Sequence, residues 1–408
     1  MKLNKKLTLV TSVVTILLVV TGCSPSQQEM FNAAIKMQDV KSMQQHTTMT
    51  FQLTGSGFDP NVQQQVNTAA MFLNNAKLDL DVKTSGNEQK TAVKAEENIN
   101  LALQGMDIKV PIWVDSDLTG KTPKVTEIIK IPQIAKASLP PQFANKDYMV
   151  MDPMNMSNSG LGAMDMTKLT EFSKKFQATE LKFLTSYSQR FNPTINAYGN
   201  SSEYMQTDDG LKMVSSYQIS INDAQFKELI RYSVNNFVQD KEAMNFVKEF
   251  MDSIIGMSQT PDKAKSLSDF DQAFKAFDVN QQVAFLAKFN TVMDQLKNVT
   301  LLGDRGLKLD YAVYNGYFIK ESTAIDLKMD MAQINQFMNT VNGKPTASVD
   351  AKGTVDMMIN CSTNISKINT PLEIQIPELN KINSFNYLDL MNLITKPNKK
   401  SRIGLVNE

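Results

Sequence analysis

The chain contains very few of the residues that build the commonest catalytic and metal centres. Its 408 residues include a single histidine, His46, and a single tryptophan, Trp113. One histidine cannot supply a three-histidine metal centre, and a serine–histidine–aspartate triad would have to use His46. The sequence also lacks a P-loop, a glycine-rich dinucleotide fingerprint, and the HExxH and GxSxG motifs. We therefore expect a protein that is not an enzyme and that carries no cofactor.

Neither sign of charge is in excess. The chain has 42 basic and 42 acidic residues, so no basic surface is indicated and we expect no nucleic-acid partner. Its 42% of hydrophobic residues is typical of a folded globule. The length exceeds that of an ordinary single core, which predicts one large domain or two intimately joined ones.

The first 22 residues have the features of an export signal. Three lysines in the first six residues precede the uncharged stretch 7–20, which is too short to span a bilayer comfortably. Val20-Thr21-Gly22-Cys23 then resembles the lipobox of bacterial lipoproteins. This resemblance implies that Cys23 is diacylated, that the peptide is cut before it, and that the lipid anchors the chain to the outer, extracytoplasmic face of the cell membrane. The alternative is an ordinary secretory signal in which this cysteine occurs by chance.

The rest of the chain divides into three predicted segments. Residues 23–29 would be the lipidated cysteine and a short polar tether, 30–395 a single large exported domain, and 396–408 a polar tail. Because lipidation would consume Cys23, Cys361 would have no partner for an intramolecular disulfide. The fold must then rest on its hydrophobic core.

Apolar and polar residues alternate over long stretches near both ends of the domain. Met49, Phe51 and Leu53 share one parity, and the pattern recurs at 78–82, 93–103, 106–114, 125–131, 148–151, 307–313, 325–331 and 347–361, with a final short strand expected at 372–376. Gly105 and Asn315-Gly316 favour tight hairpin turns. A period of two predicts an antiparallel sheet with one buried and one wet face.

The middle of the domain, about 165–297, is mainly helical in pattern. A helix is expected at 167–191, followed by a hairpin that turns at Asp208-Asp209-Gly210. Apolar residues then recur at helical spacing from 223 to 256, and again from 260 to 296 with a break. Two shorter helices are expected nearer the start of the chain, at 30–43 and at 60–74.

Together these patterns predict an α+β fold in which a curved antiparallel β-sheet carries amphipathic helices packed on one face. The order strand, helix, strand occurs at 47–84 and again at 323–362, which suggests a two-fold pseudo-repeat around the helical middle. The residues of the two segments do not match.

Six methionines lie close together in one segment, and thioethers are soft ligands that suit Cu(I). The candidate metal ligands are Met149, Met151, Met154, Met156, Met164 and Met166. We prefer the plainer interpretation, in which Met149 and Met151 share a strand face and the others fill gaps in a loop. The chain has 25 methionines, so a local excess arises easily by chance.

Four further features have plain structural interpretations that we prefer. The segment 115–120 resembles the first half of an EF-hand loop, but position twelve is Thr126, so a hairpin turn is expected. His46 is expected at the surface or in a cap. Cys361 is in phase with apolar residues and is expected to be a buried small hydrophobic residue. Trp113 would either contact a ligand or pack, and we prefer packing.

Residues 33–152 resemble uncharacterised lipoproteins of clostridial-type Firmicutes. The similarity is carried by Lys41-Ser42-Met43, Gly105-Met106, Pro111–Asp115, Glu127–Lys130 and Tyr148–Asp152. Some of those relatives carry a copper-amine-oxidase-like N-terminal module. That module is not visible here, so no amine oxidase activity is carried over.

The order of elements also resembles that of the LolA and LppX type of lipoprotein carrier, in which a curved sheet encloses an apolar cavity for a lipid or acyl chain. The resemblance implies a membrane-anchored, non-enzymatic protein that binds an apolar ligand between sheet and helices. Two alternatives remain open. One is a structural or interaction protein of the cell envelope without a ligand, and the other is a Met-rich copper-binding lipoprotein. The sequence identifies no protein partner.

Overall fold

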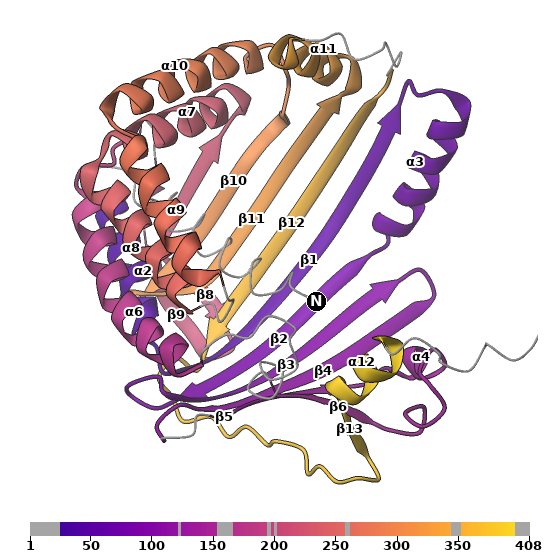
Figure 1. The fold of residues 1–408 in the computed structure, drawn as a ribbon. Coiled ribbons are helices and arrows are strands. Elements are labelled where there is room, and N and C mark those ends of the chain that lie inside the picture. The colour runs from indigo at the N-terminus through magenta and orange to yellow at the C-terminus, as the bar shows by residue number, and fades with distance from the viewer. Residues whose placement is uncertain are drawn as a thin grey trace, which may run out of the picture.

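The computed structural model describes residues 25–120, 124–152, 166–193, 197–199, 202–257, 262–343 and 352–395. Within these residues the fold is α+β, as predicted (Figure 1). Thirteen described strands form one open, curved sheet in the order β13-β6-β5-β4-β3-β2-β1-β12-β11-β10-β9-β7, and β8 pairs with β9 outside this path. All pairs among them are antiparallel except β13 with β6.

The described elements follow one another in runs of strands and runs of helices. The strands are β1 (Ser42–Ser56), β2 (Lys77–Gly86), β3 (Ala92–Leu103), β4 (Met106–Asp117), β5 (Lys124–Lys130), β6 (Tyr148–Met151), β7 (Ala197–Gly199), β8 (Glu203–Thr207), β9 (Gly210–Ile221), β10 (Leu302–Tyr314), β11 (Tyr317–Asp330), β12 (Thr354–Ser366) and β13 (Ser384–Asn386). The helices are α2 (Pro25–Gln38), α3 (Pro60–Leu73), α4 (Gln133–Lys136), α6 (Met166–Ser188), α7 (Asp223–Gln239), α8 (Lys241–Met257), α9 (Lys263–Ala276), α10 (Val279–Leu296), α11 (Met331–Asn342) and α12 (Tyr387–Thr395).

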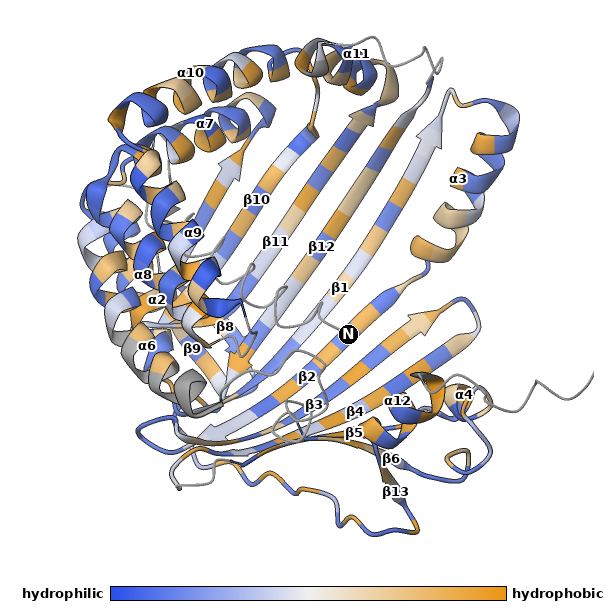
Figure 2. Cartoon of the chain, viewed as in Figure 1, coloured by the Kyte–Doolittle hydropathy of each residue, from blue (hydrophilic) through white to orange (hydrophobic). Residues whose placement is uncertain are grey.

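The alternation of residues along the strands gives the sheet two chemically different faces (Figure 2). Residues directly opposite each other in an antiparallel pair point to the same face, so the register extends each face across the sheet. One row of opposite residues runs Ile219, Leu309, Thr323, Cys361, Met49, Leu78, Leu101 and Ile108. The adjacent row runs Gln218, Asp310, Ser322, Ser362, Thr48, Asp79, Asn100 and Lys109. We call the side of the first row the apolar face and the side of the second the polar face.

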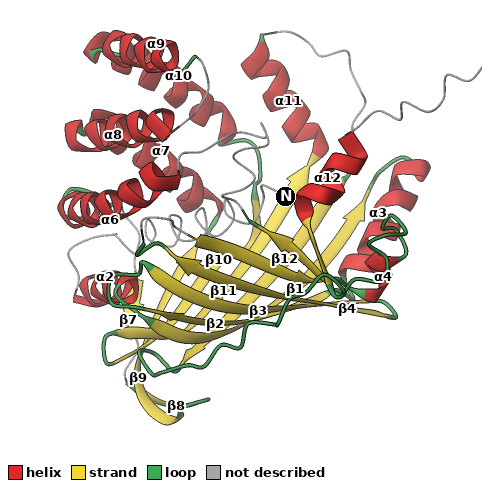
Figure 3. Ribbon diagram, turned by 60° about the horizontal axis from the view of Figure 1, so that its bottom comes forward, coloured by secondary structure: helices red, strands yellow, loops and turns green. Residues whose placement is uncertain are grey.

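The main hydrophobic core lies between the helices and the apolar face of β9–β11, and it includes Ile365 of β12. Met30 of α2, Tyr187 of α6 and Ala243 of α8 are fully or nearly fully buried in the same cluster as Ile219 and Leu309. Figure 3 shows the helices α6 to α10 stacked together on one side of the sheet. Their cover is therefore concentrated at one end of a much wider sheet.

The two predicted strand–helix–strand segments are β1-α3-β2 and β11-α11-β12. They lie side by side, because β1 pairs with β12 at the centre of the sheet. In the sheet order β2-β1-β12-β11, β12 lies two positions from β2, and β11 lies two positions from β1. The two units therefore occupy neighbouring and equivalent places in the sheet. Each helix joins two long antiparallel strands, so the repeated order in the sequence corresponds to a repeated local architecture.

The start of the domain differs from the prediction. Residues up to 29 were expected to form a tether, with a helix from 30 to 43, whereas α2 begins at Pro25 and ends at Gln38. Proline suits the first position of a helix because the N–H it lacks would be unsatisfied there anyway. Gln27 and Met30 are buried, which fixes this first turn against the body of the protein. Met43 belongs to β1.

Two further expectations were wrong in detail. The single helix predicted from 223 to 256 is two helices that meet at Asp240, whose backbone is extended (φ −83°, ψ 113°). The Asp240 carboxylate accepts a hydrogen bond of 2.9 Å from the backbone N–H of Ala243 and so caps the start of α8. The strand predicted at 372–376 is extended chain without strand pairing, and β13 and α12 follow it.

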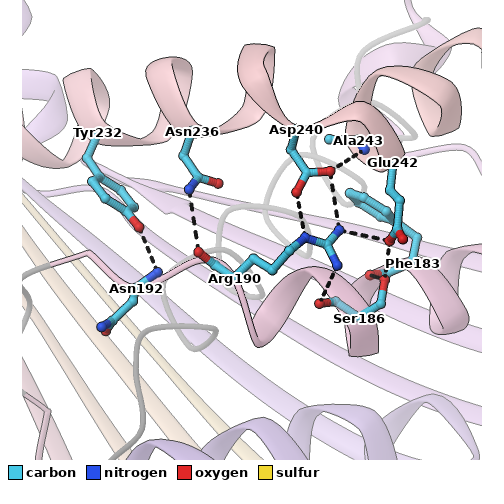
Figure 4. Close-up of polar contacts among 9 residues, drawn as sticks. All are labelled: Phe183, Ser186, Arg190, Asn192, Tyr232, Asn236, Asp240, Glu242 and Ala243. Carbon is cyan, nitrogen blue, oxygen red and sulfur yellow. Dashed lines mark hydrogen bonds and ion pairs between the residues drawn. The ribbon is translucent and has the colours of Figure 1, made fainter.

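Arg190 fixes the end of α6 to the junction of α7 and α8 (Figure 4). Its Nε donates to Asp240 over 2.6 Å, and its terminal nitrogens donate to Glu242 over 2.8 Å and to the carbonyl oxygen of Ser186 over 3.0 Å. Burial favours the neutral form of Asp240, but the hydrogen bonds from Arg190 and from Ala243 hold its pKa below the usual value. The ion pair thus stabilises the bend between the two helices.

We expect Arg190→Ala to lower the free energy of unfolding by about 1–3 kcal/mol, because it leaves the buried side of Asp240 without its charged donor. Urea unfolding would measure this. Lys241→Ala, an exposed change at the same junction, is the control. Since the folded pKa of Asp240 is lowered, the contribution is present above pH 4 and is lost as the pH falls further. Equal losses in the two variants would contradict the assignment.

Candidate functional site

One marked hollow lies within the helices. A cleft of about 390 Å³ between α6 and α8 is lined by Phe172, Phe176, Phe246 and Phe250 together with polar residues. The centre of the Phe176 ring lies 5.4 Å from that of Phe246 and 5.1 Å from that of Phe250. The rings therefore pack mainly against one another, which identifies the cleft as part of the helix stack.

His46 lies at a hollow of about 350 Å³ on the polar face. Its Nδ1 is 2.6 Å from the carboxylate of Asp81, and its Nε2 is 3.4 Å from the hydroxyl of Thr48. That hydroxyl donates to Asp79 over 2.6 Å, so its proton is directed away from the imidazole. A hydroxyl nucleophile needs the opposite arrangement, with its proton held by the base. His46 is therefore a surface residue in a polar network, as expected.

The apolar face is covered at one end and open over the rest. In the row defined above, Ile219 and Leu309 are 0% and 5% exposed beneath the helices. Met49, Leu78 and Leu101, in the same row, are each only half-buried. α3 packs against the end of β1, where Leu53 is buried, and Ile365 of β12 belongs to the main core. The helices α6 to α10 make at most a few close backbone contacts with β2, β3 and β4. The curved sheet thus presents a broad apolar surface that its own described helices do not cover.

This open apolar face is made by half-buried aliphatic, aromatic and thioether side chains from five neighbouring strands. They are Met49, Phe51, Leu78, Leu80, Val82, Ile99, Leu101, Ile108, Val110, Met357 and Ile359. Contiguous apolar surfaces of this extent mark binding sites, because leaving them in water is costly.

A polar group interrupts the apolar face where the helical cover ends. Glu321 of β11 lies opposite Tyr311 on one side and Thr363 on the other. Thr363 lies opposite Thr47, and their hydroxyl oxygens are 2.9 Å apart. Tyr311 is 5% exposed beneath the helices, whereas Thr363 and Thr47 are half-buried. Glu321 therefore lies at the border between the covered core and the open apolar face.

Burial raises the pKa of Glu321 to about 7. Among the described residues no hydrogen bond or ion pair holds the charged form of this carboxyl, so desolvation acts alone. Burial also raises the pKa of Tyr311 and of Cys361, so both neighbours are neutral at pH 7. On β3 the pKa of Glu97, a second carboxyl on the apolar face, is raised by burial as well.

The charges are divided between the two faces. At the paired positions of the described strands, the charged residues of the apolar face are Glu97, Glu127 and Glu321, all acidic. The lysines of these strands lie on the polar face. They are Lys77, Lys83, Lys94, Lys109, Lys124, Lys130, Lys212, Lys308, Lys320 and Lys328. The apolar face is therefore weakly acidic and has no built-in cation.

The predicted site residues are placed only in part. Met149 and Met151 share one face of β6, as the plainer interpretation expected. Met154, Met156 and Met164 lie outside the described residues, as do the side chain of Met166 and the whole of Cys23. The copper site and the lipidation site therefore stay predictions.

The expectations for Trp113 and Cys361 have different outcomes. Trp113 packs edge-on against Tyr148, with 6.2 Å between ring centres, as we preferred. Cys361 is on the apolar face, but it is half-buried and not fully buried. The prediction was wrong because the parity of a strand residue fixes its face, and only the helices decide whether that face is covered.

Sequence reasoning missed Glu321 and Glu97, although a signal was present. Each glutamate is in phase with the apolar residues that follow it, Ile325 and Leu327 in β11, and Ile99 in β3. A charged residue at an apolar position is an exception that commonly marks function or strain.

No protein-family model, curated protein sequence or solved structure matches this chain. In the part of the chain that the structure describes, no helix combines the length and the apolar character needed to cross a membrane.

Glu321 should make the stability depend on pH. Because folding raises the pKa of this acid from 4.5 to about 7, the folded state binds more protons than the unfolded state between these values. Stability must then fall as the pH rises through that window, and we expect a loss on the order of 2 kcal/mol. Urea unfolding from pH 4 to 8 should show this loss in the wild type but not in Glu321→Gln. The control Glu96→Gln, on the polar face of β3, should lose stability with rising pH as the wild type does. If the wild type and Glu321→Gln have parallel pH profiles of stability, the prediction is wrong.

Proposed function

We propose that this protein is a lipoprotein, anchored through Cys23 on the extracytoplasmic side of the cell membrane, that binds an apolar ligand without chemical change. The observation that carries the proposal is the open apolar face on β12 and β1–β4. The ligand class that fits it is a lipid or another molecule with a long hydrocarbon chain.

The free energy gained by burying a hydrocarbon chain on the open apolar face exceeds the cost of association. Each buried methylene contributes about 0.8 kcal/mol, so a chain of about twelve methylenes contributes roughly 10 kcal/mol before costs. Association and ordering consume at least about 4 kcal/mol of this. A binding free energy of about 6 kcal/mol remains, which corresponds to a dissociation constant in the range of tens of micromolar.

The flexible methionines on this surface suit a ligand without a fixed shape. Met49 and Met357 lie on the adjoining strands β1 and β12, opposite Leu78 and Leu327 respectively. Unbranched thioether side chains adapt to irregular apolar partners more readily than branched ones. This favours a hydrocarbon chain over a rigid ring system.

The proposed anchor would keep this surface close to its ligand supply. Because α2 begins at Pro25, only one residue separates the proposed lipidated cysteine from the first helix. α2 packs on β11, so the sheet would lie close to the bilayer. The alternative is an envelope interaction protein without a ligand, in which a protein partner would cover the open apolar face.

We expect the double variant Leu80→Gln, Val110→Gln to bind a neutral naphthylamine dye at least tenfold more weakly than the wild type. The two residues lie in one row across β2, β3 and β4, and polar amides there would break the apolar surface. Fluorescence titration of a chain that begins at Pro25, and so contains every described element, would measure this. Lys109→Gln, next to Val110 but on the polar face, should bind like the wild type. Absence of dye binding to the wild type, or equal loss in the control, would refute the proposal.

A second expected outcome uses the thiol of Cys361, which lies within the open apolar face. Saturating dodecanol should slow its alkylation by a maleimide at least fivefold, because a bound chain would cover it. The shift in mass over time would measure the rate. In the double variant the same concentration of dodecanol should give much less protection, and protection equal to that of the wild type would place the ligand elsewhere.

A further inference from the structure

The polar group around Glu321 is built from three adjoining strands. The carboxyl comes from β11, the Thr363 hydroxyl from β12 and the Thr47 hydroxyl from β1, all in one row. Thr323 and Cys361 occupy the next row beside them, and Cys361 is hydrogen-bonded to Thr363. The group thus places one acidic side chain and several hydroxyls inside a surface that is otherwise apolar.

The position of this group suits the end of a ligand and not its middle. On one side of Glu321 the row continues into Tyr311, which is buried beneath the helices and cannot be reached. On the other side the row continues through Thr363 and Thr47 to Leu80, Ile99 and Val110 on the open apolar face. A ligand that lies along this row must therefore end at Glu321.

The open side of the row is long enough for a whole hydrocarbon chain. From β11 to β4 there are five steps between strands of about 4.8 Å each, or about 24 Å. One acyl chain spans about 15 Å, half of the hydrocarbon core of a bilayer. From β1 to β4, beyond the two threonine hydroxyls, three steps leave about 14 Å for the tail of a single-chain ligand whose head lies at Glu321.

The charges around Glu321 select the chemistry of the head. From the neighbouring strands it faces Tyr311 and Cys361, which are neutral at pH 7, and no described residue offers it a cation. Among the helices packed on this end of the sheet, α2 carries Glu29, whose carboxylate accepts a hydrogen bond from Tyr217. The carboxyl of Glu97 lies on the same face. α2 also carries Lys36, which donates to the carbonyl oxygen of Asn315 and lies over the ring of Tyr317. At Glu321 itself an anionic head would meet a carboxylate, whereas a cationic head would supply the missing partner.

We propose that the ligand is a single-chain amphiphile with an ammonium head group, held by the Glu321 carboxylate and the hydroxyls of Thr363 and Thr47, with its tail along the row to Val110. This inference rests on the proposed function and names the ligand class of the same surface. It differs from a general apolar site in requiring a charge at one end of the ligand.

The test compares three ligands of equal chain length, dodecylamine, dodecanol and dodecanoate, as competitors of the naphthylamine dye at pH 8 on the chain from Pro25. We expect the amine to bind at least tenfold more tightly than dodecanoate, with dodecanol between them, since one charge-assisted hydrogen bond commonly changes affinity by about this factor. Glu321→Gln should weaken amine binding roughly tenfold and leave dodecanol binding unchanged. Glu96→Gln, on the polar face, should change neither.

A measurement on the wild type alone guards against a folding defect in the variant. At pH 5 the carboxyl is protonated, so the preference for the amine over dodecanol should fall to within about twofold. If dodecanol and the dye bind but the amine is not preferred at pH 8, or its preference survives at pH 5 and in Glu321→Gln, the ammonium inference is overturned and the apolar site stands. If none of the ligands binds, the proposed function fails with it.

Discussion

The structure depends on a mismatch between the width of the apolar face and the area that the helices can cover. Most long strands alternate between apolar and polar residues, and the antiparallel register carries that alternation from strand to strand, so the apolar face extends over most of the sheet. The helix stack covers it mainly at β9–β11, where residues such as Ile219 lose all exposure, and α3 covers the end of β1. Over β12 and β1–β4 the same kinds of side chain are left half-buried. This area is the best candidate for the functional site.

The concentration of the helices at one end has a local cause. α7 and α8 are two helices that meet at Asp240, not one long helix. Asp240 ends the first helix and caps the second, and Arg190 fixes that bend to the end of α6. A compact stack results, anchored to the core through Tyr187 and Ala243. An ion pair at a helix junction thus helps to hold this stack together.

The raised pKa of Glu321 depends on its position at the edge of the area that the helices cover. Within a fully covered core, a carboxyl without a partner would be expelled or replaced, and on a fully open surface its pKa would be ordinary. At the border it is desolvated by the core and still reachable from the open side. The polar face shows the contrast, because His46 there finds its acidic partner on the neighbouring strand.

The sequence by itself determined the α+β class, the antiparallel strands, the hairpins at Gly105 and Asn315-Gly316, and the face on which each strand residue lies. These features depend on local periodicity and on turn chemistry, which a linear sequence contains in full. The tertiary structure alone decided the strand order, the bend at Asp240 and the extent of the helical cover. It therefore also decided that Cys361 is half-buried and that Glu321 lies at the edge of an open apolar surface. Burial depends on contacts between segments far apart in the chain, such as α2 with β11, and no local pattern records whether such a contact forms.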